Sequence, residues 1–131
     1  MQKKVICLFV LLTVMFLPFM ASAETSAFQG LRSQLKACRK VVLEGVDKAD
    51  CGKMLARVKI MNKYIGKLFK QAKLDGEGNY VAALQRSVEL FRFQCALYDD
   101  GITDTGVVSS FGSLLKTFVK YKDFREENGL K

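Results

Sequence analysis

Apolar residues recur at alternating steps of three and four positions in four stretches of the chain. Because an α-helix has about 3.6 residues per turn, this spacing gathers the apolar side chains on one side of a helix. The longest stripe runs from Cys51 to Ala72 and follows Asp47, a residue typical of helix N-caps. The other stripes run from Phe28 to Val42, from Val81 to Tyr98, and from Val107 or Val108 to Tyr121.

Breaks that contain glycine separate these stripes. Gly45 and Gly101 follow the ends of two predicted helices, where a left-handed cap favours glycine. Residues 75–79 are expected to form a surface loop, residues 103–105 to cap the last helix, and residues 125–131 to fray into solvent. Short connections favour antiparallel neighbours, so the pattern predicts an all-α fold, a small antiparallel bundle of three to four helices.

The first 23 residues have the pattern of a cleavable signal peptide. Lys3 and Lys4 precede an almost wholly apolar run over residues 5–20, and Ala21-Ser22-Ala23 then offers an A-x-A cleavage site. The alternative is an uncleaved membrane anchor, but a bilayer span needs about 20 apolar residues and Pro18 shortens the run. We therefore predict residues 1–23 as signal peptide and 24–131 as one helical domain, periplasmic or secreted, without a lipid anchor.

The cysteines of the predicted mature chain all lie on the apolar stripes near one end of the bundle. An oxidising compartment is expected to join two of them. In a sequentially wound bundle the helices that carry Cys38 and Cys95 are diagonal, which predicts one intramolecular disulfide between Cys51 and either Cys95 or Cys38. The third thiol is then either buried and inert, which we favour, or able to link two chains into a homodimer.

Several kinds of chemistry are absent from the sequence. The chain has no histidine, which removes the commonest general base and zinc ligand, and it has no phosphate-binding glycine loop. Residues 75–79 begin like a calcium loop, but Tyr80 and Arg86 stand where that loop needs Gly and Glu. Asp99, Asp100 and Asp104 are explained by a solvated turn. We therefore predict no catalytic, cofactor or metal site, and a protein that is not an enzyme.

Positive charge is concentrated on the second predicted helix. Seven basic and no acidic residues lie between Cys51 and Leu74. Five of them fall within about 60° of the direction opposite the apolar stripe, namely Lys59, Lys63, Lys67, Lys70 and Lys73. An ordinary solvated face explains lysines of this kind, but the absence of glutamate one turn away leaves their mutual repulsion uncompensated. These five lysines are the predicted partner-binding residues.

The net charge favours an anionic partner. Loss of Lys3 and Lys4 with the signal peptide leaves 19 basic and 13 acidic side chains, a net charge of +6. The leading hypothesis is a non-catalytic protein that binds an acidic envelope protein as an inhibitor, immunity, assembly or chaperone-like factor. The alternative is contact with anionic membrane lipid or lipopolysaccharide through the lysine face. Nucleic acid is the least favoured partner, because no aromatic residue interleaves with the lysines. Phe93 and Phe124 are further candidate interface anchors.

Overall fold

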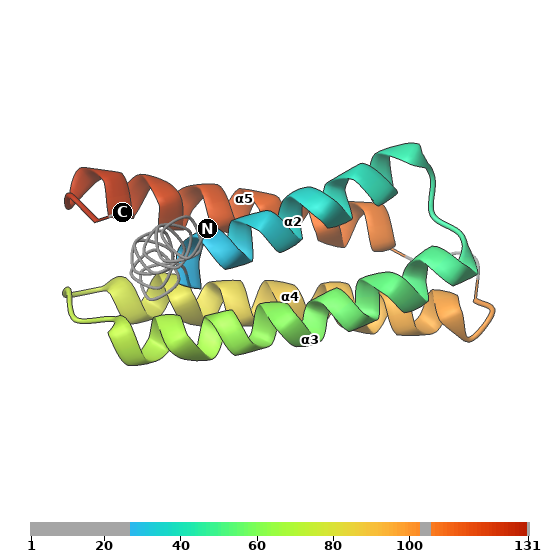
Figure 1. Cartoon of the computed structure of the whole chain (residues 1–131), viewed down its shortest axis with the longest axis horizontal. Coiled ribbons are helices and arrows are strands. Elements are labelled where there is room, and N and C mark those ends of the chain that lie inside the picture. Colours follow the sequence, from blue (N-terminus) through green and yellow to red (C-terminus); the bar gives the residue numbers. More distant parts are fainter. Residues whose placement is uncertain (1–26, 103–105, 131) are drawn as a thin grey trace, which may run out of the picture.

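The protein is an all-α, four-helix antiparallel bundle in a computed structural model that describes residues 27–102 and 106–130 (Figure 1). The helices are α2 (Ala27–Glu44), α3 (Lys48–Gln71), α4 (Glu77–Asp99) and α5 (Val107–Glu127). Each helix packs mainly on the next one in the chain, and α2 and α5 touch only sparsely. The predicted signal peptide and its cleavage site lie outside the described residues. No helix in the described part of the chain is long and apolar enough to cross a membrane.

The predicted helix ends are confirmed where the sequence carries a cap. Asp47 has extended backbone, and its Oδ1 accepts a hydrogen bond from the Asp50 amide at 2.9 Å, as an N-cap does. Gly45 and Gly101 both have positive φ, 102° and 97°, which a side chain would strain. Residues 103–105, which were predicted to cap the last helix, lie outside the described residues, and the N-cap of α5 is Gly106.

The core consists of the predicted stripes. Of the stripe residues on α3, all from Cys51 to Leu68 are at most 1 % exposed to solvent. At one end of the bundle the core is aromatic, with the Phe28 and Phe118 rings stacked at a centroid distance of 4.9 Å. At the other end it holds the three cysteines. Tyr98 donates to the Val46 carbonyl at 2.8 Å and so fastens the end of α4 to the α2–α3 connection.

Two predicted boundaries were wrong, and one side chain explains both. Glu77 lies inside α4 rather than in a surface loop, and its buried carboxylate faces the end of α5. The helix α5 continues to Glu127, so Arg125 is not frayed: it is 12 % exposed and lies 3.9 Å from Glu77. The contact between these two charged residues links the first residue of α4 to the last turn of α5.

The predicted disulfide is not formed in the structure. Cys38, Cys51 and Cys95 are free, buried thiols. The closest approach is between Cys51 and Cys95, on the adjacent helices α3 and α4, at 4.4 Å. A disulfide bond is about 2.05 Å long, so these thiols are in contact without being bonded.

Candidate functional site

Four of the five predicted partner-binding lysines lie on the outer face of α3, and Lys73 follows directly after the C-cap residue Ala72, so it was wrongly predicted to lie on the helix. Lys59, Lys63, Lys67, Lys70 and Lys73 are all exposed, while the stripe on the opposite side of the same stretch of chain is buried. Lys70 follows Lys59 by eleven positions, which is about 16 Å along a helix axis. We call these five residues the α3 lysine face.

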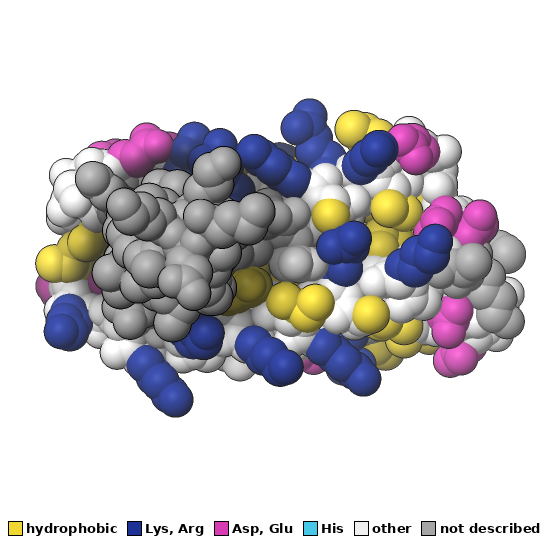
Figure 2. Space-filling view, viewed as in Figure 1, with side chains coloured by type: hydrophobic (Ala, Val, Ile, Leu, Met, Phe, Trp, Pro, Cys, Tyr) yellow, Lys and Arg dark blue, Asp and Glu magenta, His cyan; other side chains and the backbone are white. Residues whose placement is uncertain are grey.

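Negative charge does not compensate this face. None of its lysines has an ion pair within the described residues, and α3 carries no acidic residue after Asp50. Lys67 places its Nζ 5.8 Å from the centre of the Tyr64 ring, a cation–π contact that leaves its charge available. Acidic side chains gather at the two ends of the bundle in Figure 2, while basic ones occupy the stretch between.

Partly exposed apolar side chains accompany the lysines. Ile60, one turn before Lys63, and Phe69, next to Lys70 in the chain, are each 38 % exposed. Protein interfaces gain most of their affinity from apolar and aromatic anchors rather than from peripheral charges. Ile60 and Phe69 are nine positions apart, which at 100° per residue places them on opposite flanks of the α3 lysine face, so each flank of the face offers an apolar contact beside the charged ones.

The other proposed anchors differ from each other. Phe93 projects from α4 and is 52 % exposed, as expected for an interface residue. Phe124 instead packs on the core, with its ring centre 4.6 Å from that of Tyr80. Of these two residues, only Phe93 remains a candidate anchor.

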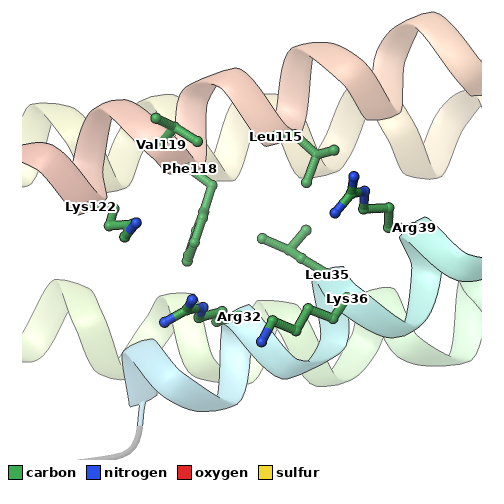
Figure 3. Close-up of a pocket in the computed structure, with 8 residues that line it drawn as sticks. All are labelled: Arg32, Leu35, Lys36, Arg39, Leu115, Phe118, Val119 and Lys122. Atoms are coloured by element: carbon green, nitrogen blue, oxygen red, sulfur yellow. The ribbon is translucent and has the colours of Figure 1, made fainter.

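A groove between α2 and α5 was not predicted from the sequence. It has a volume of about 290 Å³ and is lined by apolar residues from both helices and by four cationic ones (Figure 3). The lining residues are Arg32, Leu35, Lys36, Arg39, Leu115, Phe118, Val119 and Lys122. We call this the α2–α5 groove. The sequence does show four basic and one acidic residue on α2, but it does not show that α2 and α5 would stay apart.

A buried polar cluster joins three segments at the aromatic end. One oxygen of Glu77 accepts from the backbone amides of Lys73 and Leu74 at 3.1 and 3.3 Å. The other accepts from the Tyr121 hydroxyl at 2.8 Å, and Arg125 donates to that hydroxyl at 3.1 Å. Burial, followed by the hydrogen bond to Glu77, raises the pKa of Tyr121 to about 12. All these groups are engaged with one another, so the cluster is suited to stabilising the fold.

The cysteine end of the bundle is unsuited to nucleophilic chemistry. Burial raises the pKa of the Cys38 thiol to about 11 and also raises the pKa of Cys51 and of Cys95. A reactive cysteine needs the opposite, an accessible thiol with a lowered pKa. The environment is that of structural cysteines.

Acidic residues do not assemble into a metal site in the part of the chain described. No group of three or more cysteine or carboxylate side chains there could hold an ion. Asp99 and Asp100 lie at the end of α4, and Asp104 of the same predicted cluster falls outside the described residues.

No protein-family model, curated protein or solved structure matches this chain.

Proposed function

We propose that the protein is an exported, non-catalytic binding module that recognises an acidic surface of a protein partner through the α3 lysine face. One observation carries the proposal: four exposed lysines in about three turns of α3 and a fifth just past its C-cap, none with an ion pair in the described residues. Like charges placed this close repel each other and slightly destabilise the free helix. An acidic partner relieves that repulsion and is also steered toward the face over a Debye length of about 8 Å at physiological salt.

A protein surface is favoured over a lipid surface by the apolar residues beside the lysines. Ile60 and Phe69 are only partly exposed, so they can pack against a shaped surface but cannot insert deeply into a bilayer. Lysines near an anionic membrane still contribute about 1 kcal/mol each, so lipid or lipopolysaccharide contact is the alternative to be tested.

The experiment compares two variants with the same change in net charge. In the first, Lys59, Lys63, Lys67 and Lys70 are replaced with Glu; in the matched control, Lys40, Arg86, Lys116 and Lys120, which lie on the other three helices, are replaced with Glu. Mature wild-type chain and both variants are used to capture partners from envelope extract, and the captured protein is then purified and titrated against each. We expect the first variant alone to lose the partner, and wild-type binding to weaken with salt.

Two results would contradict the proposal. Equal binding by both variants would show that the α3 lysine face is not the recognition surface. Flotation of wild-type chain with vesicles rich in phosphatidylglycerol, lost in the first variant and with no protein captured, would assign the face to membrane lipid instead.

Export rests on the pattern of residues 1–23, and the cysteines provide an independent test of it. In an oxidising compartment we expect Cys51 and Cys95 to form the bond, because theirs is the close approach. Oxidised glutathione would take up the two electrons and two protons that the thiols lose, and would leave as two reduced glutathiones. Peptide mapping of chain recovered from the envelope should find Cys51 joined to Cys95 and Cys38 free. Recovery of residues 1–23 on a fully reduced chain would contradict export.

A further inference from the structure

The α2–α5 groove exists because one seam of the bundle is incompletely closed. The other neighbouring helices pack closely, whereas α2 and α5 make little contact apart from Phe28, whose ring meets the rings of Phe118 and Tyr121 and the Arg125 guanidinium. A second hollow of about 290 Å³ continues the groove past those rings, and the two hollows share Arg32 and Lys122. The depression is therefore elongated and follows the seam.

The inner part of the groove is apolar. In Figure 3, Leu35 points toward α5 while Leu115 and Phe118 point toward α2. Val119, on the rim, is 50 % exposed, although valine is among the side chains most often buried in proteins. An alkyl chain laid along the seam would remove this surface from water, which is favourable in proportion to the apolar area buried.

The rim of the groove is cationic. Arg32, Lys36 and Arg39 follow one another on one side of α2, and Lys122 faces them from α5 (Figure 3). No carboxylate lines the groove itself, whereas Glu126 lines the second hollow and has a weak, exposed ion pair with Lys122 at 3.8 Å. Guanidinium groups bind carboxylates through two parallel hydrogen bonds, so the two arginines suit a carboxylate head group.

The size of the groove limits the ligand. Each of the two hollows has a volume of about 290 Å³, at the lower end of the range for small-molecule sites of roughly 300–1,000 Å³, and they follow one another along a single seam. A depression of that shape suits one extended alkyl chain rather than the two chains of a phospholipid. We propose that the α2–α5 groove binds the anion of a single-chain fatty acid, with the carboxylate among the α2 cations and the chain along the apolar floor. This proposal shares no residue with the α3 lysine face and holds whether or not that face binds a protein.

The test is calorimetric titration of the full mature chain with laurate below its micellar concentration. We expect one laurate per chain, bound at least about tenfold more tightly than dodecyl maltoside, dodecyltrimethylammonium or acetate. Binding of dodecyl maltoside as tight as laurate would overturn the role of the cations. Binding of acetate as tight as laurate would overturn the role of the apolar floor. Many laurates per chain would show ordinary detergent adsorption and would overturn the site.

Variants locate the site. Lys36→Glu with Arg39→Glu should weaken laurate binding by at least about tenfold, and so should Val119→Glu, which places a charge on an already exposed position. The matched control is Lys40→Glu with Lys116→Glu, on the same two helices but outside the groove, and it should bind as wild type does. Unfolding by urea, followed by circular dichroism, checks that all three variants fold. Equal weakening in the control would mean that laurate binding depends only on the net charge of the protein, and it would contradict the proposal.

Discussion

Replacement of Glu77 with Ala should be among the most damaging single changes in this protein. The substitution removes an acceptor from two backbone amides at the end of α3 and from the Tyr121 hydroxyl, and it leaves the 12 % exposed Arg125 without its carboxylate. Breaking a buried ion pair by removing one partner costs about 3 to 5 kcal/mol. A domain of this size has about 5 to 15 kcal/mol of stability in total.

Urea denaturation followed by helical circular dichroism measures this cost. With an m-value of about 1.5 kcal/mol/M, a loss of about 3 to 5 kcal/mol lowers the urea midpoint by about 2 to 3 M. Glu77→Gln keeps an acceptor but loses the charge, so its loss should be smaller than that of Glu77→Ala.

The matched control is Glu89→Ala. Glu89 also pairs with an arginine, Arg92 at 3.0 Å, but both side chains are nearly half exposed. Exposed pairs of this kind contribute about 0 to 1 kcal/mol. If Glu77→Ala destabilised the protein no more than Glu89→Ala, the reasoning that Glu77 joins α3, α4 and α5 through a buried polar cluster would be refuted.

Three further predictions concern packing, pH and thiol accessibility. Gly30→Ala would bring its Cβ to 2.6 Å from Cε1 of Tyr64 and should lower the free energy of unfolding by about 1 to 3 kcal/mol. Gly66→Ala, whose Cβ would meet nothing within 4 Å, should instead raise it by up to about 1 kcal/mol, and the opposite order in urea melts would contradict the α2–α3 packing. The folded state holds the Tyr121 proton more tightly than the unfolded state does, so the contribution of this proton to stability is complete below pH 10 and is lost as the pH rises to about 12. Tyr121→Phe should therefore make urea midpoints less sensitive to pH over this range, and an unchanged pH dependence would contradict the raised pKa of Tyr121. The three buried thiols of reduced protein should react with Ellman's reagent at least about tenfold more slowly in native buffer than in concentrated urea, and equal rates would contradict their burial.

The helices and the core were predictable from the sequence because both depend on local periodicity. The α3 stripe from Cys51 to Leu68 is buried throughout, and the cap residues Asp47, Gly45 and Gly101 act where the pattern placed them. Periodicity also determined which side of α3 the lysines occupy, so the α3 lysine face was predictable as a surface, although its role was not.

The features that were missed depend on contacts between residues distant in the chain. Two glycines beside Glu77 are typical of a loop, and only a tyrosine 44 positions later makes a buried carboxylate favourable there. Arg125 looks like part of a charged tail unless Glu77 and the Phe28 ring, 4.5 Å from its guanidinium, are known to face it. The α2–α5 groove likewise depends on how closely two helices approach, and no periodicity within one helix reports that distance.

The order in which the helices pack also bears on how fast the chain folds. The main contacts join α2 to α3, α3 to α4 and α4 to α5, so each can form after closing only a short connection. Proteins dominated by such local contacts fold in microseconds to milliseconds. A ribosome adds only about 5 to 20 residues each second, so α2 and α3 have time to pair before α5 is synthesised. If the chain is exported unfolded, its secretion therefore requires that the first helical hairpin be kept from pairing in the cytoplasm.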